Sequence, residues 1–300
     1  MERLRKLHSR IQERYFGYIM CLPAIILFTV FVIYPFIKGF YISLHRWDGL
    51  GEMSWVGFKN YLFAVTDKTF WQTMGNTFLY ALITPVLKNI LGFALAMLFV
   101  QKIKGMNLFR TCTYIPYTFS YVVVGVLWCW IYNPTFGLLN AFLRAVGLES
   151  WIHGWLSDAT IALYSVILVD VWKCMGFHAV LFMAGLQGIP QELYEAASID
   201  GASKFQQFRY ITIPQLNSTL VTSMLLAITG AFVNNYDVVN VMTGGGPYHS
   251  TEVGLTYIMN TAFQLNNMGK ANAMSMILVL FVSIFGFMQL KTMTREENYE

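Results

Sequence analysis

Charge is scarce in this 300-residue chain: 12% of its residues are charged, 56% are hydrophobic, and the mean hydropathy is +0.50. Such a composition excludes a disordered segment, and apolar runs this long exclude a water-soluble enzyme. Cysteine is also rare, which excludes a secreted module held together by disulfides. The four cysteines lack C-x-x-C spacing and are interpreted as small buried hydrophobic side chains (Cys21, Cys112, Cys129 and Cys174). The composition is that of a membrane protein.

The residue arrangements that carry catalysis are missing as well. The glycine run from Thr243 to Pro247 lacks the G-x-x-x-x-G-K-[ST] order of a phosphate-binding loop, so it is interpreted as a turn. The sequence contains no basic face with interleaved aromatics, so nothing in it indicates a nucleic-acid partner. The five histidines are scattered, without H-E-x-x-H or paired carboxylates (His8, His45, His153, His178 and His249). We therefore expect no catalytic residue, metal site or cofactor in this chain.

Six apolar stretches are long enough to cross a bilayer, which takes about 20 helical residues. The first follows a basic start, but it is long for a signal peptide and no A-x-A cleavage site follows, so it is interpreted as an uncleaved anchor. The sequence predicts an all-α polytopic membrane protein with six transmembrane helices in one domain, 1–300. The spans are expected at 15–40, 70–100, 109–131, 161–186, 220–241 and 273–290.

The distribution of Lys and Arg predicts the orientation of these spans. The cations are concentrated in the two tails and in the connections 101–110 and 187–217, whereas the opposite connections carry fewer. Positive residues are retained on the cytoplasmic side. Both termini and the 187–217 loop are therefore expected in the cytoplasm, and the turn 243–247 is expected outside.

The connection between the fourth and fifth spans carries the most informative pattern. Pro190 suits the first position of a helix, where its missing N–H would have no partner anyway. Ala196 and Ala197 give a surface that another protein's backbone can approach closely. Gly201 permits a left-handed turn between two helices, and Pro214 is expected to end the second. From these residues alone, a docking loop and an ordinary amphipathic surface loop are equally consistent.

The same connection resembles the EAA loop in permease subunits of binding-protein-dependent ABC importers. It contains Glu195-Ala196-Ala197, Gly201 three residues after Ser198, and Ile211-x-Ile213-Pro214, with Ile213 where the family has leucine. Other segments resemble the carbohydrate branch: Ala184-Gly185-Leu186-Gln187-x-Ile189-Pro190, Asp200-Gly201-Ala202, Val56-Gly57-Phe58-x-Asn60-Tyr61 and Thr243-x-Gly245-Gly246-Pro247. The tryptophan-containing segment before Asn60 is similar to the larger maltose-permease subunit and the glycerol-phosphate permease. The maltose subunit's extra outer domain and two additional N-terminal spans are missing.

The resemblance implies a type I importer permease, a non-catalytic subunit in a bacterial or archaeal cell membrane. Its implied partners are a second permease, two ATPases that bind ATP and Mg, an extracellular or periplasmic sugar-binding protein, and membrane lipid. Opening and closing of the ATPases would be transmitted through the loop. The implied contacts to an ATPase are Glu195, Ala196, Ala197, Asp200 and Gly201.

Three charged side chains are expected at the centres of spans, where a charge is costly unless it is paired or faces a cavity. Lys88 interrupts the second span. Asp170 and Lys173 lie three residues apart in the fourth, so they share a helical face and are close enough to neutralise each other. Two interpretations stay open: a structural ion pair, or an Asp170 that faces a hydrated substrate path. A phosphorylated solute is compatible with Lys88 or Lys173.

Aromatic and carboxamide side chains suit a sugar, because C–H faces stack on rings and hydroxyls need paired donors and acceptors. Aromatic stripes are also typical of packing or of lipid-facing belts, whereas buried carboxamides without partners are costly. In the maltose relative, the sugar-contacting positions align with six residues here, two of which, Asp170 and Cys174, replace an amide and a glycine. Together with Asn234, the expected substrate path is Tyr117, Tyr121, Asp170, Cys174, Phe177 and Asn235.

An ion-coupled secondary transporter that uses Asp170, Lys173 or Asp237 is the alternative. Against it, the sequence shows no paired, interrupted halves of the kind expected from inverted repeats. A scaffold without transport would not need the polar run 234–237 in the fifth span. Which sugar is carried, and whether it is a mono- or an oligosaccharide, stays open.

Overall fold

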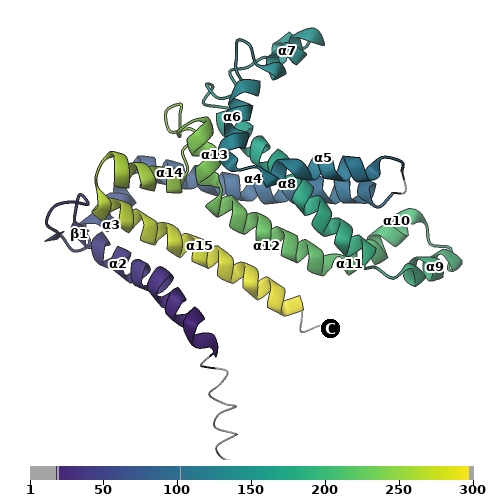
Figure 1. Ribbon diagram of the computed structural model, residues 1–300, viewed down its shortest axis with the longest axis horizontal. Helices are drawn as coiled ribbons and strands as arrows, with labels where there is room; N and C mark the ends of the chain where they lie inside the picture. Colours follow the sequence, from purple (N-terminus) through teal and green to yellow (C-terminus); the bar gives the residue numbers. More distant parts are fainter. Residues whose placement is uncertain (1–17, 19, 102, 297–300) are drawn as a thin grey trace, which may run out of the picture. The chain divides into compact units, whose positions relative to one another are not determined.

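The computed structural model describes residues 18, 20–101 and 103–296, and most of them are helical (Figure 1). The basic N-terminal tail, the start of the first expected span and Lys102 lie outside the described residues. The chain divides into two compact units. One consists of Met1–Thr66 with Ile258–Ile277, and the other of Asp67–Tyr257 with Leu278–Glu300.

The first unit combines an apolar helix with a short hairpin. The Asn60 side chain donates to the carbonyls of Ser43 and His45, each at 2.8 Å, and so fixes the chain where the helix ends and the hairpin begins. Asn60 thereby satisfies carbonyls that a helix end leaves without partners. The elements are η1 (Thr29–Ile33), α2 (Tyr34–Ser43), antiparallel β1 (His45–Arg46) and β2 (Ser54–Trp55), α3 (Lys59–Thr66), η4 (Asn260–Gln264) and the start of α15 (Met268–Glu296).

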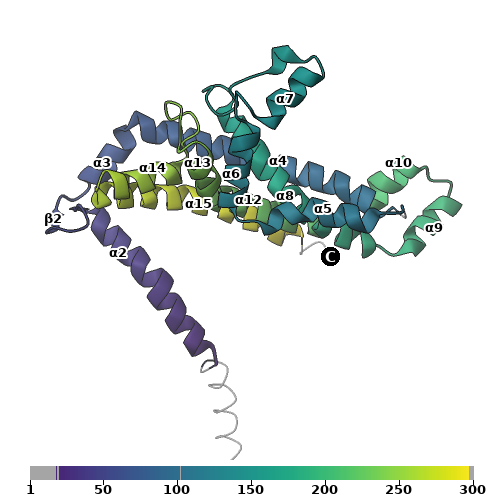
Figure 2. The ribbon, with the colours of Figure 1, turned by 45° about the horizontal axis from the view of Figure 1, so that its top comes forward.

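The second unit is a helical bundle built around α4 and α8, which lie side by side (Figures 1 and 2). Helix α12 packs against α4, α5 crosses α8, and α13 packs against α6. The elements are α4 (Lys68–Phe99), α5 (Met106–Thr118), α6 (Tyr121–Ile131), α7 (Leu138–Ala145), η2 (Glu149–Trp151), α8 (Ala162–Gln187), α9 (Gln191–Ile199), α10 (Lys204–Gln207), η3 (Phe208–Thr212), α11 (Ile213–Gln215), α12 (Asn217–Val233), α13 (Asn235–Met242) and α14 (Gly254–Met259).

Glycine allows two of these helix pairs to approach closely. A Cβ on Gly92 of α4 would lie 2.7 Å from the Cβ of His178 on α8. A Cβ on Gly176 of α8 would lie 2.1 Å from the Thr113 carbonyl oxygen on α5. Small residues are the usual means of bringing backbones together in a membrane, where no hydrophobic force drives helices against each other.

Four described helices are long and apolar enough to cross a membrane, and the count rises to six if each of two bent pairs is one span. The four confirm the second, fourth and sixth expected spans and the described part of the first (Met20–Ser43, Lys68–Phe99, Ala162–Gln187 and Met268–Phe287).

The prediction of a continuous third span at 109–131 is wrong. Helices α5 and α6 meet at 104°, because Phe119 and Ser120 are extended and the Ser120 hydroxyl caps α6 by accepting from the Val123 N–H. The fifth expected span is interrupted too, since α12 ends at Val233 and α13 begins at Asn235.

The expectation that all four cysteines are buried is also wrong. Cys174 is buried and Cys129 is half-buried, but Cys21 and Cys112 are exposed on this chain. An apolar sequence context predicts removal from water, which lipid or another subunit supplies as well as this chain's own core.

Candidate functional site

Five of the seven residues expected along the substrate path come together where the bent pair α5–α6 crosses α8. Tyr117 lies in the last turn of α5, and Tyr121 is the first residue of α6. The other three follow one face of α8 at spacings of four and three residues. We call these five residues the aromatic cluster: Tyr117, Tyr121, Asp170, Cys174 and Phe177.

Asp170 is the polar centre of the cluster and is fully buried. Its Oδ2 accepts from Lys88 Nζ of α4 at 2.7 Å, and its Oδ1 accepts from the Tyr121 hydroxyl at 2.9 Å. The Cys174 Sγ lies 3.4 Å from the same hydroxyl. The predicted pairing of Asp170 with Lys173 is therefore wrong, because α4 runs along α8 and presents Lys88 directly to the carboxylate.

Lys173 interacts with the end of α5 instead. Its Nζ donates to the Tyr117 carbonyl oxygen at 2.9 Å and lies over the Tyr121 ring, 4.5 Å from the centroid. The carbonyls in the last turn of a helix have no partner within the helix and form the negative end of its dipole. The break between α5 and α6 therefore creates the acceptor that Lys173 uses.

An aromatic stack extends the cluster. Tyr117 and Phe177 are stacked with centroids 4.6 Å apart and planes 15° from parallel. Tyr117 stays 36% exposed. A partly exposed ring next to hydrogen-bonding groups is the combination that a sugar needs.

The two asparagines lie at the break between α12 and α13. Asn235 is 1% exposed, and neither atom of its carboxamide has a hydrogen-bond partner among the described residues. Asn234 is half-buried and precedes α13. Helix α13 packs against α6, the helix that begins at Tyr121, and also contacts α8, but no hydrogen bond joins Asn235 to the aromatic cluster within the described residues. An unpaired buried carboxamide is costly, so Asn235 is suited to a ligand hydroxyl.

Sequence reasoning missed a second buried polar contact between helices. His178 Nδ1 lies 2.8 Å from the Ser223 hydroxyl and connects α8 to α12. His178 was counted only among scattered histidines, and nothing in the sequence indicates which helix lies opposite it.

The loop after α8 has the two-helix form that its sequence predicts. Gly201 has φ +79° and turns the chain between α9 and α10, and Ser203 forms a capping box with Gln206 at the start of α10. Two details differ from the prediction. Pro190 precedes α9 instead of occupying its first turn. Pro214 lies inside α11, and the chain bends by 62° at Leu216.

Hydrogen bonds brace this loop internally. Gln207 Nε2 donates to the Ser198 hydroxyl at 2.8 Å, and the Tyr194 hydroxyl lies 2.9 Å from the Thr212 hydroxyl. On its membrane side the loop borders a cavity of about 610 Å³ lined in part by the ends of α4 and α8. The loop is therefore a small braced unit.

The outward surface of the loop carries the residues expected to contact an ATPase. Glu195, Ala196, Asp200 and Gly201 are exposed, and Ala197 is half-buried. The Ile199 side chain is 88% exposed and Phe205 is 73% exposed. Large apolar side chains gathered on an exposed loop indicate a surface that a partner covers.

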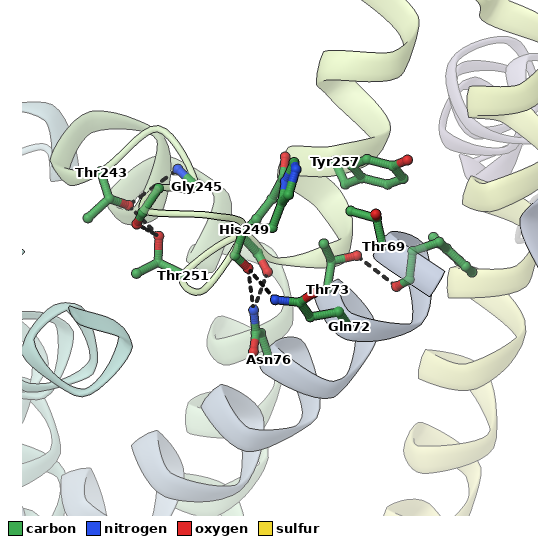
Figure 3. Close-up of polar contacts among 12 residues, drawn as sticks. Thr69, Gln72, Thr73, Asn76, Thr243, Gly245, His249, Thr251 and Tyr257 are labelled. Atoms are coloured by element: carbon green, nitrogen blue, oxygen red, sulfur yellow. Dashed lines mark hydrogen bonds and ion pairs between the residues drawn. The ribbon is translucent and has the colours of Figure 1, made fainter. Parts of the chain in front are cut away.

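The segment after α13 forms the predicted glycine turn and is held to α4 (Figure 3). Gly244 and Gly245 have positive φ, and the Thr243 and Thr251 hydroxyls lie 2.7 Å apart. The Asn76 carboxamide donates to the His249 carbonyl at 3.1 Å, and Gln72 donates to the same oxygen at 3.3 Å. These bonds give the turn one fixed conformation.

Two ionisable contacts flank the same segment. His249 pairs with Glu252, and the Tyr257 hydroxyl donates to Asp67 at 2.6 Å. Partial burial and the Asp67 carboxylate raise the pKa of Tyr257. Within the described residues, no group of three or more His, Cys, Asp or Glu is placed to hold a metal ion.

Comparisons with known proteins agree on the family. The family described as "binding-protein-dependent transport system inner membrane component" matches residues 88–291. The probable ABC transporter permease YurN of Bacillus subtilis is 36% identical over 93% of this chain and 96% of its own. The trehalose/maltose permease MalF of Thermococcus litoralis is 33% identical over 94% and 95%.

A third relative and a solved structure extend the comparison. The sn-glycerol-3-phosphate permease UgpA of Agrobacterium fabrum is 30% identical over 94% of this chain and 96% of its own. The fold matches a bacterial ABC transporter for the acidic polysaccharide alginate with a TM-score of 0.82 and 21% identity, over 97% of this chain and 99% of that one. The expected type I permease fold and the resemblance to permease subunits of binding-protein-dependent ABC importers are thereby confirmed. This chain belongs to the family of inner membrane components of binding-protein-dependent transport systems.

Proposed function

We propose that this chain is one of two permease subunits of an ATP-driven sugar importer and lines half of its translocation path. The aromatic cluster is the observation that carries this proposal, because it places a partly exposed ring beside hydrogen-bonding groups at a break in a membrane span. Relatives named for trehalose/maltose, for starch degradation products and for diacetylchitobiose are 33%, 28% and 33% identical. Their names support an oligosaccharide.

The partners follow from the family. An external sugar-binding protein delivers the solute, a second permease completes the path, and two ATPases bind ATP and Mg. One solved transporter of this fold was crystallised with a periplasmic protein bound to an alginate pentasaccharide. The braced loop, with Glu195, Ala196, Asp200 and Gly201 exposed and Ala197 half-buried, transmits ATPase closure to the spans by rigid-body motion.

The energy source provides the test of this function. We expect proteoliposomes that contain both permeases and both ATPases to take up sugar when the binding protein is outside and ATP inside. A protonophore should leave that uptake unchanged. Uptake that needs an ion gradient and survives removal of the ATPases contradicts the proposal.

The ion-coupled alternative has less support from the site. Its coupling carboxylate would be Asp170, but both oxygens of that carboxylate are already occupied, one by Lys88 and one by Tyr121. Lys173, a second of its three candidates, is bonded to the Tyr117 carbonyl. Neither group is available to bind and release a coupling ion without breaking a buried contact.

Orientation gives a second prediction, with both termini in the cytoplasm. In a variant that lacks the exposed Cys21 and Cys112, a cysteine at Tyr248, which is 91% exposed, should react with an impermeant maleimide added to intact cells. A cysteine at the exposed Ser203 should react only after the membrane is opened. The reverse pattern would show that the chain is inserted the other way round.

A further inference from the structure

Lys173 is a buried cation that forms no ion pair with a carboxylate of the described residues. Its side chain is 3% exposed. The ion pairs in the described part of the chain are Lys88 with Asp170 and His249 with Glu252. Asp237, on the neighbouring α13, forms none. An ionised side chain inside a membrane span is costly and indicates function.

The contacts of Lys173 compensate only part of its charge. An ammonium has three donors, and one of them bonds the Tyr117 carbonyl at 2.9 Å. The end of α5 supplies about half a negative charge, and the faces of Tyr121 and Tyr117 supply weaker attraction, with Nζ 4.5 and 5.2 Å from the ring centroids. Because Lys88 and Asp170 cancel each other, the aromatic cluster together with Lys88 and Lys173 keeps a net positive charge.

The Lys173 ammonium lies over the tyrosine rings that are expected to contact the sugar. This ammonium lies over one face of the Tyr117 ring. The same ring stacks on Phe177 and is partly exposed. A neutral sugar stacks through weakly positive C–H groups on the negative face of a ring. A nearby ammonium draws on the same negative face, so it weakens that stacking and strengthens attraction to an anionic oxygen.

We infer that the transported sugar carries an anionic group, a carboxylate or a phosphate, and that Lys173 selects for it. The inference rests on the proposed function and names the substrate class of the same site. The Lys173 ammonium lies over the rings of Tyr117 and Tyr121. An anionic oxygen of the sugar, bound at the edge of these rings, would neutralise the positive charge of Lys173.

Matched probes test the substrate class on the wild-type complex. The reconstituted transporter with its own binding protein is given trehalose or trehalose 6-phosphate, and galactobiose or digalacturonate, while ATP hydrolysis is measured. We expect the acidic member of a pair to stimulate hydrolysis about tenfold more than its neutral partner, and the pair that responds distinguishes phosphate from carboxylate. Equal or greater stimulation by a neutral member overturns the inference and leaves a sugar importer standing. If no sugar stimulates hydrolysis, the proposed function fails as well.

Substitutions then test Lys173 itself. With saturating binding protein, Lys173→Gln should lower the maximal uptake of the acidic probe about tenfold. The half-saturating concentration, which the binding protein sets, should stay unchanged. Lys173→Arg should restore most of the rate, and Lys104→Gln, which removes an exposed loop cation, should have no effect.

Unchanged acidic uptake in Lys173→Gln would overturn the assignment. So would an equal loss for acidic and neutral probes in both Lys173 variants, since that marks a structural role. If Lys173→Gln fails to assemble, the arginine variant and the wild-type probe pairs decide.

Discussion

Replacing Lys88 with methionine is expected to destabilise the permease by about 3–5 kcal/mol, because it leaves Asp170 ionised, buried and unpaired. Asp170 is fully buried and Lys88 is 2% exposed, so water cannot replace the lost ammonium. The Tyr121 hydroxyl and the weakly donating Cys174 thiol would remain to hold the carboxylate. The measurement is the midpoint of thermal aggregation of the detergent-solubilised complex, followed by size-exclusion chromatography.

A second substitution separates loss of the pair from loss of lysine packing. Lys88→Met combined with Asp170→Asn removes both charges and keeps an acceptor for Tyr121, so most of the lost stability should return. Lys104→Met, at an exposed lysine, is the matched control and should leave the midpoint unchanged. If the double variant is no more stable than Lys88→Met alone, the charge pair is not the reason for the loss.

The ion pair also shows why part of the site was not predictable. Asp170 and Lys173 are helical neighbours, and the sequence favours local pairing because only distances along one helix are known from it. The actual partner, Lys88, lies 82 residues away along the chain. Which helix faces Asp170 depends on packing, and the glycine contact between α4 and α8 that brings Lys88 close is a property of the fold.

The lengths of the apolar stretches predicted the long helices well, but they did not reveal the breaks within the third and fifth expected spans. No charged residue follows Arg110 before Ile131, so a hydropathy pattern reports one span from 109 to 131. The signal for the break was Ser120, a preferred helix cap placed directly before an apolar run. Of the seven residues that side-chain chemistry and the resemblance placed along the path, the structure brings five together, and their role stays a prediction. Asn235 was singled out for its cost when unpaired, and the structure leaves its carboxamide without a partner among the described residues.

Valine at position 201 is expected to abolish coupled transport while membrane insertion persists. Gly201 has φ +79°, and no atom lies within 4 Å of the position its Cβ would take, so backbone conformation is the constraint and space is not. A left-handed conformation costs an L-residue about 1–2 kcal/mol, and a β-branched side chain suffers most. The turn between α9 and α10 should therefore open and move Glu195 and Ala196 away from an ATPase.

Asparagine at the same position is the matched control, because asparagine tolerates positive φ while adding a side chain of similar size. We expect Gly201→Asn to retain most ATP-driven uptake, and Gly201→Val to lose it together with co-purification of the ATPases. Equal loss in both variants would mean that the added side chain blocks the partner, which makes Gly201 a contact instead of a hinge. Normal uptake and assembly in Gly201→Val would remove the loop from the coupling mechanism, because a strained turn cannot present the same surface to a partner.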